Sequence, residues 1–205
     1  MKDLVSYQTA SQQAQNEQPK AEVMTLKQIL YAYGSDLDGH PSVYCGTYRK
    51  YNEGSLFGAW LDITKFSNYD EFIDVCRQLH EDEKDPELMF QDYDSFPDSL
   101  YCESCMGEDT FDKIIEYAEL DDDDKEAFDD YLDNGHDYNI ERFRDAYCGK
   151  WESKVDFAQH IIDECYDIDK AMGSLAFYFD YEAYARDLFM SDFEMGENNH
   201  VFRTV

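Results

Sequence analysis

The stretch ELDDDDKEAFDDYLD, residues 119–133, constrains the fold most, because it combines dense negative charge with an apolar stripe at helical spacing. The stripe consists of Ala127, Phe128, Tyr131 and Leu132. That spacing predicts an amphipathic helix, and Asn134–Gly135 is a typical helix stop. Asp123 and Glu126, three residues apart, resemble a capping box at the start. The like charge has four candidate explanations: a solvated helix face, a disordered acidic run, a metal site or a functional negative surface.

Composition argues against a disordered tail and against several classes of partner. The 205-residue chain has a formal net charge of -30, yet 43% of its residues are hydrophobic and 16% are aromatic. Disordered acidic segments are poor in aromatic residues, so we expect this chain to bury a core. The negative charge argues against direct binding to nucleic acid or to an anionic membrane, since both are polyanions.

The charge is concentrated in the middle of the chain. Residues 80–137 contain 23 acidic and 3 basic residues, a net charge of −20. Solubility of a small domain needs a net charge of only about 2–8. For Asp121 to Asp124 alone, side-chain capping together with the helix macrodipole, which favours anions at a helix start, explains the charge as well as a functional surface does. Acids farther along the helix and on the preceding segment need another explanation.

Hydrophobic patterning predicts an α+β fold of three small domains behind an N-terminal extension. The predicted units are the extension at 1–40, a small α+β domain at 41–100, an acidic helical domain at 101–142 and a C-terminal α+β domain at 143–205. Within the extension we expect a polar, flexible lead at 8–20 and a helix at 22–33. We interpret the extension as an appendage to the main body.

Within these units the pattern predicts individual elements. SVYCGTY and LFGAWLDI predict a hairpin with a turn at RKYNEGS, NYDEFIDVCRQLHEDEK an amphipathic helix, and PELMFQDYDSF a third strand. DTFDKIIEYAEL predicts a helix before the acidic one, and NIERFRDAY a helix after it. In the last unit AYCGKW predicts a strand, KVDFAQHIIDECYD and FYFDYEAYARDLFM predict helices, and DFEM and HVFRTV predict a strand pair.

The sequence offers no catalytic constellation, and a calcium site is poorly supported. An EF-hand loop that starts at Asp130 has Gly135 and Glu141 in suitable places, but Leu132 stands where an oxygen ligand is required. The five histidines are scattered, and neither a metalloprotease motif nor a phosphate-binding loop is present. We therefore expect neither an enzyme nor a cofactor.

The six cysteines are spread through a chain large enough to fold without disulfides, which favours reduced thiols in a cytoplasm. Cys102 and Cys105 form one CxxC motif, whereas a structural zinc site usually needs two. The strand-to-helix context of a thioredoxin-like site is only weakly met. We interpret the pair as two free thiols. The N-terminus shows no leader pattern and no apolar run spans a bilayer, so we expect a cytoplasmic protein.

Several long stretches resemble one protein family. VYCGTYRKYNEGSLFGAWLDI, EFIDVCRQLHEDEKDPELMFQDYDSFP and YFDYEAYARDLFM with HVFRTV are similar, in order, to the ArdA antirestriction proteins of conjugative plasmids and transposons. The family's antirestriction motif falls on the acidic stretch, at Leu120, Asp124, Ala127 and Tyr131. The chain departs from the family in residues 1–40 and in CESC, and we expect neither to be essential.

The resemblance implies a bacterial DNA mimic that is not an enzyme and needs no cofactor. Such proteins are elongated homodimers of three small domains. They occupy the DNA-binding groove of the methyltransferase core of Type I restriction-modification enzymes, and so protect incoming foreign DNA. A net charge of -30 matches the phosphates of roughly 15 base pairs, at two charges per base pair.

The expected partner-binding surface is acidic and acts collectively. Its expected members are Asp109, Asp112, Glu116, Glu119, Asp121, Asp122, Asp123, Asp124, Glu126, Asp129, Asp130 and Asp133. Two alternatives stay open: an acidic interaction module for another basic DNA-binding protein, and a carboxylate-dependent metalloenzyme. Binding to a Type I methyltransferase that DNA competes away separates the first two hypotheses, and metal-dependent turnover would support the third.

Overall fold

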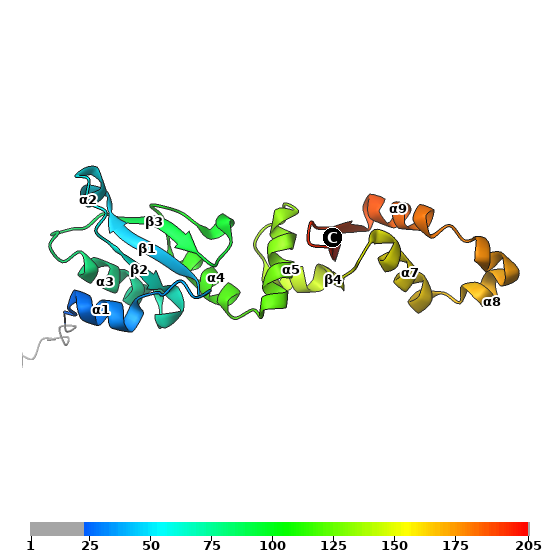
Figure 1. The fold of residues 1–205 in the computed structure, drawn as a ribbon, viewed down its shortest axis with the longest axis horizontal. Coiled ribbons are helices and arrows are strands. Elements are labelled where there is room, and N and C mark those ends of the chain that lie inside the picture. The colour runs from blue at the N-terminus through cyan, green and yellow to red at the C-terminus, as the bar shows by residue number, and fades with distance from the viewer. Residues whose placement is uncertain (1–22, 205) are drawn as a thin grey trace, which may run out of the picture.

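The computed structural model describes residues 23–204, which form nine α-helices, three short 3₁₀ helices and two three-stranded antiparallel sheets. This confirms the predicted mixture of helices and sheets. The polar lead at 8–20 lies outside the described residues. Figure 1 shows α1 (Leu26–Tyr33) and the first sheet at one end of the long axis, α5 (Asp122–Asp133) near the middle and α8 (Ile168–Met172) at the other end.

The first sheet contains the predicted hairpin and third strand, in the order β2-β1-β3. The strands are β1 (Ser42–Thr47), β2 (Ala59–Asp62) and β3 (Leu88–Asp94). The predicted amphipathic helix is α3 (Tyr69–Leu79), and the side chain of Asn68 caps it by accepting a hydrogen bond from the Glu71 N–H. Phe72 of α3 stacks on Phe90 of β3, with ring centroids 5.7 Å apart, and so fixes the helix to the sheet.

The connection between β1 and β2 is not the simple turn predicted for RKYNEGS. It contains a short helix, α2 (Tyr48–Asn52), before Gly54 reverses the chain with a φ of 81°. The Thr47 hydroxyl caps α2 at the Lys50 N–H. The buried Lys50 side chain donates to Asp82 at 2.6 Å. These tertiary contacts stabilise the helix, and turn propensity alone does not reveal them.

The expected appendage is, from Leu26 onward, part of the first packed unit. Ile29 of α1 is fully buried, and Tyr33 stacks on Phe66 with ring centroids 4.4 Å apart. The Tyr33 hydroxyl donates to Glu71 of α3 at 2.7 Å. The other apolar residues at helical spacing, Val23, Leu26 and Leu30, are exposed, so a narrow contact holds α1. The expectation was wrong because helical spacing alone does not show which partner covers a short helix.

The middle of the chain is helical, as predicted. The helices are α4 (Glu108–Ala118), α5 and α6 (Ile140–Ala146). Phe111 of α4 packs against Phe72 at a centroid distance of 5.6 Å, whereas Phe128 of α5 packs against Phe143 of α6 at 5.2 Å. Buried residues of the first sheet, these three helices and Phe202 form one hydrophobic cluster. The acidic helix is therefore held by its apolar stripe on an ordered core.

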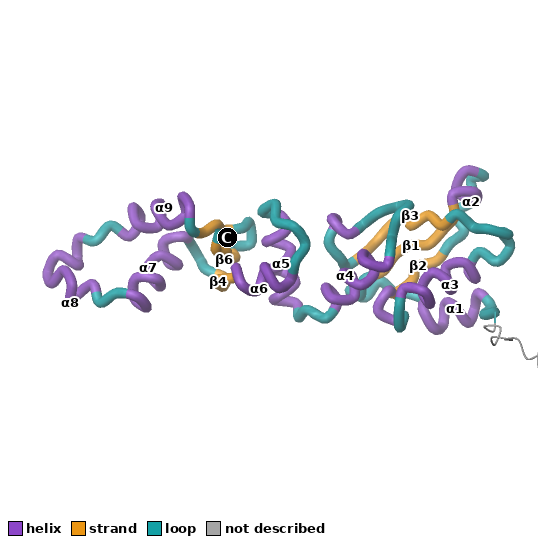
Figure 2. Tube along the Cα trace, turned by 180° about the vertical axis from the view of Figure 1, so that it is seen from behind, coloured by secondary structure: helices purple, strands orange, loops and turns teal. Residues whose placement is uncertain are grey.

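The second sheet has the order β4-β6-β5 and confirms the predicted strands. Its strands are β4 (Tyr147–Lys150), β5 (Phe193–Met195) and β6 (His200–Arg203). Between β4 and β5 the chain forms α7 (Lys154–Cys165), α8 and α9 (Tyr181–Ser191). The helix predicted at FYFDYEAYARDLFM begins only at Tyr181, because Asp180 caps it at the Ala183 N–H. The 3₁₀ segment Gly173–Tyr178 precedes it. Neither this segment nor α8 was predicted. Figure 2 shows α7, α8 and α9 forming an open arm beyond this sheet.

Candidate acidic binding surface

The start of the acidic helix is fixed by Asp121, whose side chain accepts a hydrogen bond from the Asp124 N–H at 2.8 Å. The predicted capping box at Asp123 and Glu126 is therefore wrong. Leu120, two residues after the end of α4, is buried, and Asp121 directly after it caps α5. The first turn of α5 then carries three carboxylates, where the macrodipole favours negative charge.

Most of the predicted surface acids are exposed on α4 and α5 or just beside them. The exposed ones are Asp109, Asp112, Glu116, Glu119, Asp121, Asp122, Asp123, Glu126 and Asp133, whereas Asp124 and Asp129 are half-buried. Lys113 pairs with Asp109 at 2.8 Å and Lys150 pairs with Glu126 at 2.8 Å. The other exposed acids have no ion pair within the described residues. The nine exposed acids, from Asp109 to Asp133, together form what we call the acidic surface.

Asp130 is the exception, because it is only 1% exposed and cannot present its charge to a partner. Its carboxylate accepts hydrogen bonds from the backbone N–H groups of Asn198 and His200, at 3.2 and 3.4 Å. Asp130 therefore joins α5 to the turn between β5 and β6. This role also removes it as the first ligand of an EF-hand loop. The prediction failed because an acid on an acidic helix gives no local signal of burial.

The residues assigned to the antirestriction motif mainly hold α5 in place. Leu120, Ala127 and Tyr131 are buried, and Asp124 is half-buried. Tyr131 stacks on His136 and packs against Phe202 of β6, with centroid distances of 4.0 and 5.3 Å. Leu120, Ala127 and Tyr131 are therefore part of the hydrophobic core beneath the acidic surface. A direct contact of these three apolar side chains with a partner is not compatible with their burial.

An acidic groove of about 930 Å³ lies between α5 and the segment that follows β3. Its acidic lining residues are Asp92, Asp94, Asp98, Asp122, Asp129 and Asp133, and its one basic lining residue is Lys125. The sequence did not single out the three acids at 92–98 as part of the site. Their place inside the acidic block 80–137 was the available signal, but only the fold brings them beside α5.

Two tyrosines order carboxylates in this groove. The Tyr93 hydroxyl donates to Asp98, and this hydrogen bond raises the pKa of Tyr93 to about 12. The Tyr117 hydroxyl donates to both oxygens of Asp129, at 3.1 and 3.0 Å. Burial raises the pKa of Asp129, and the nearby carboxylates of Asp133 and Asp98 raise it further. The groove thus collects negative charge at an electrostatic cost.

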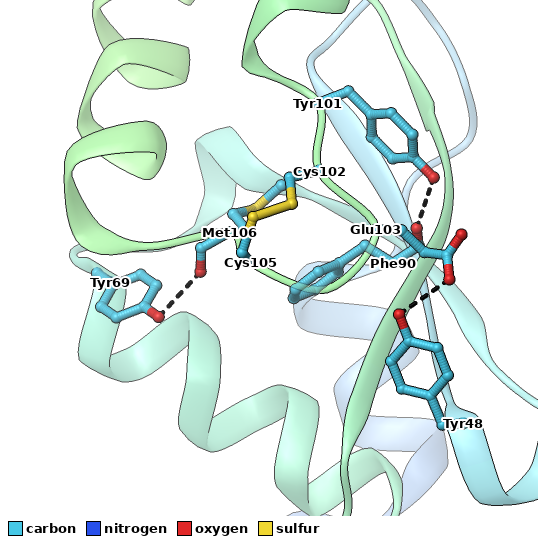
Figure 3. Close-up of a disulfide and its surroundings, with 8 residues drawn as sticks. All are labelled: Tyr48, Tyr69, Phe90, Tyr101, Cys102, Glu103, Cys105 and Met106. Carbon is cyan, nitrogen blue, oxygen red and sulfur yellow. Dashed lines mark hydrogen bonds between the residues drawn. A yellow bond between two sulfur atoms is a disulfide. The ribbon is translucent and has the colours of Figure 1, made fainter.

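Cys102 and Cys105 form a disulfide, so their interpretation as two free thiols is wrong (Figure 3). Their Cα atoms are 5.4 Å apart, which is within bridging distance. The sequence spacing permitted this pairing but could not require it. Between residues 23 and 204, no group of three or more His, Cys, Asp or Glu side chains is arranged to hold a metal ion.

None of the helices in the described part of the chain is long and apolar enough to cross a membrane. The sequence matches the family described as Antirestriction protein (ArdA) over residues 43–202, which is most of the chain. The chain therefore belongs to the ArdA antirestriction protein family. Membership implies an antirestriction function exercised on restriction enzymes, by a protein that inhibits without catalysis. No curated protein matches the chain closely enough for comparison.

Proposed function

We propose that this protein is a DNA mimic that occupies the DNA-binding groove of Type I restriction-modification enzymes, in their methyltransferase core, and so protects incoming foreign DNA. One observation carries the proposal: carboxylates on α4, α5 and the 92–98 segment stand outward from helices and a strand whose apolar faces are buried in one core. The negative charge is therefore ordered, as it is along a duplex.

The physical gain on binding resembles that of DNA. A basic groove gains affinity when it neutralises phosphates and their counterions are released, and fixed carboxylates are neutralised in the same way. Ordered side chains lose less conformational entropy on binding than a flexible acidic tail does. Long-range attraction also accelerates the encounter. No base is presented, so inhibition does not depend on the recognition sequence of the enzyme.

We further propose an elongated homodimer of three small domains in the cytoplasm, with divisions near residues 100 and 142. The succession of units along the long axis in Figure 1 supports the elongated arrangement. The 3₁₀ segment beside α8 supports self-association, because three of its apolar side chains are largely exposed: Leu175 (61%), Phe177 (89%) and Tyr178 (78%). A monomer gains nothing from such a patch, whereas a second copy would cover it.

The test is an inhibition assay against several Type I enzymes that recognise different DNA sequences. The proposal expects inhibition of each at comparable protein concentrations. The alternative, an acidic module for another basic DNA-binding protein, expects tight binding to that protein and no inhibition of Type I enzymes. Inhibition that depends strongly on the recognition sequence would contradict the mimicry of backbone charge.

A further inference from the structure

The Cys102–Cys105 disulfide lies in the loop between β3 and α4 (Figure 3). Cys105 is exposed and Cys102 is half-buried, so the disulfide lies at the surface of the protein. The thiols of Cys45 and Cys76, by contrast, are buried. Exposed disulfides are typically the ones that exchange with external thiols, whereas buried ones resist reduction.

The loop is attached to the first sheet on both sides of the bond. The Phe90 N–H donates to the Glu103 carbonyl at 2.8 Å, and the Tyr101 hydroxyl donates to the Phe90 carbonyl at 2.8 Å. β3 pairs with β1 along its other edge, so these bonds cover the outer edge of β3 at Phe90. Beyond the disulfide, the Met106 carbonyl accepts from the Tyr69 hydroxyl at 3.0 Å.

The Glu103 side chain adds a contact to the residue that directly follows β1. Its carboxylate accepts a hydrogen bond from the Tyr48 hydroxyl at 2.9 Å, and Tyr48 begins α2. Glu103 is one of the two residues between the cysteines, so the disulfide restricts the backbone that makes both the edge bond and this contact. The covalent ring and the edge pairing therefore act on the same few residues.

We propose that the Cys102–Cys105 disulfide is a reversible redox clasp that keeps the 101–106 loop closed over the outer edge of β3. A dithiol reductant opens it in two steps. One reductant thiolate attacks the Cys105 sulfur, the bond to Cys102 breaks, and Cys102 leaves as a thiolate that takes up a proton. The second reductant thiol then displaces Cys105. The reductant ends as a disulfide, and its two electrons and two protons end on the cysteines.

Opening the clasp leaves the loop more conformations and lowers the fraction of time in which Glu103 covers Phe90. Releasing a ring this small raises the population of open loops by on the order of tenfold. The rest of the unit keeps its fold, because Phe72, Phe90 and Phe111 remain packed together in the core. The expected effect of reduction is thus local.

The test is amide hydrogen exchange of the full chain, measured by NMR in oxidised and reduced dithiothreitol buffers. The Phe90 amide should exchange about tenfold faster after reduction. The Val43 amide within β1 should keep its rate. Alkylation followed by mass spectrometry should show Cys102 and Cys105 becoming reactive together in one two-electron step, while the exposed Cys165 is reactive throughout.

A variant with both Cys102→Ser and Cys105→Ser is the matched control. It should show the fast Phe90 exchange in either buffer and no response to the reductant. Equal exchange rates of the Phe90 amide in oxidised and reduced wild type would overturn the proposal. Alkylation of Cys102 and Cys105 in the oxidising buffer would overturn it as well. None of these measurements involves a restriction enzyme, so they stand apart from the proposed function.

Discussion

The carboxylate of Asp130 lies over Gly196, in the space that a Cβ atom at position 196 would need. Asp130 belongs to α5, whereas Gly196 directly follows β5, and the same carboxylate accepts hydrogen bonds from the backbone of Asn198 and His200. The acidic helix therefore uses one of its acids to hold the second sheet. The acids on its outer face are left to the solvent.

This contact predicts coupled effects on stability. Gly196→Ala should lower the free energy of unfolding by about 1–3 kcal/mol, because the added methyl group overlaps the Asp130 carboxyl. Asp130→Ala should cost a similar amount, because the buried His200 N–H and the part-buried Asn198 N–H lose their acceptor. In urea denaturation, the double variant should lose less stability than the sum of the single losses, since the methyl group then occupies vacated space. Strictly additive losses would show that the two residues do not share this space.

His200 predicts how stability changes with pH. It is buried, with Nδ1 3.0 Å from the Tyr147 hydroxyl, and burial followed by the Lys150 charge lowers its pKa, while Asp130 and Glu126 oppose the shift. The unfolded chain then binds a proton more readily than the folded one. The free energy of unfolding should be at its full value above about pH 6.5 and should fall as the pH drops toward the lowered folded pKa.

The check is chemical denaturation of wild type, His200→Gln and His40→Gln between pH 7.5 and 5. His200→Gln should show a shallower loss of stability over this range than wild type. His40→Gln should keep the wild-type slope, because His40 is exposed. Identical slopes for all three proteins would show that His200 is not the source of the pH dependence of stability.

Two truncations test whether α1 is an appendage. A chain that starts at Val23 keeps Ile29 and Tyr33, whereas a chain that starts at Pro41 loses both. The shorter chain should be less stable by about 2 kcal/mol or more, because a buried isoleucine and a stacked tyrosine are removed. Thermal unfolding of the two purified chains measures the difference. Equal midpoints would restore the view that the first forty residues are dispensable for folding.

The proposed homodimer predicts that the exposed 3₁₀ segment Gly173–Tyr178 is needed for association. Phe177→Ser together with Leu175→Ser should shift the protein toward monomer, because it removes the apolar area that a second copy would cover. Tyr31→Ser is the matched control, since Tyr31 is an equally exposed aromatic residue on α1. Sedimentation velocity over a range of concentrations distinguishes the variants. A dimer that persists in the double variant would place the interface elsewhere. A monomeric wild type would contradict the proposed homodimer.

Neutralising the acidic surface should weaken inhibition gradually. The changes are Asp112→Asn, Glu116→Gln, Glu119→Gln, Asp122→Asn and Asp133→Asn, made singly and together. Each exposed charge contributes about 1 kcal/mol or less, so single variants should inhibit nearly as well as wild type. The combined variant should bind more weakly, with a shallower dependence on salt. One single change that abolishes inhibition in a folded protein would indicate a catalytic or metal-binding carboxylate.

Much of the fold can be predicted from local pattern, because hydrophobic periodicity and turn-forming residues are properties of short stretches of sequence. Phe72, Val75 and Leu79 predict α3, and the Asn134–Gly135 stop ends α5 where expected. The capping residue was misplaced by two positions, because four successive aspartates offer several possible caps. In the folded chain it is Asp121 that accepts the hydrogen bond from the Asp124 N–H.

The site was less predictable, because its members meet only in the folded chain. Exposed acids such as Asp112 and Glu116 follow from the polar face of a helix. The burial of Asp130 depends on a turn 68 residues away in the sequence. Asp98 joins the acidic groove because β3 ends beside α5. The pairing of Cys102 with Cys105 depends on loop geometry that the spacing alone leaves open.

The most direct test of DNA mimicry is a competition titration. A purified Type I methyltransferase core is mixed with this protein, and a DNA duplex carrying its recognition sequence is added while the bound fraction is measured at several salt concentrations. DNA mimicry predicts mutually exclusive binding, in which the apparent dissociation constant rises linearly with free DNA and also rises with salt. A ternary complex that contains enzyme, DNA and this protein together, with an affinity indifferent to salt, would contradict it.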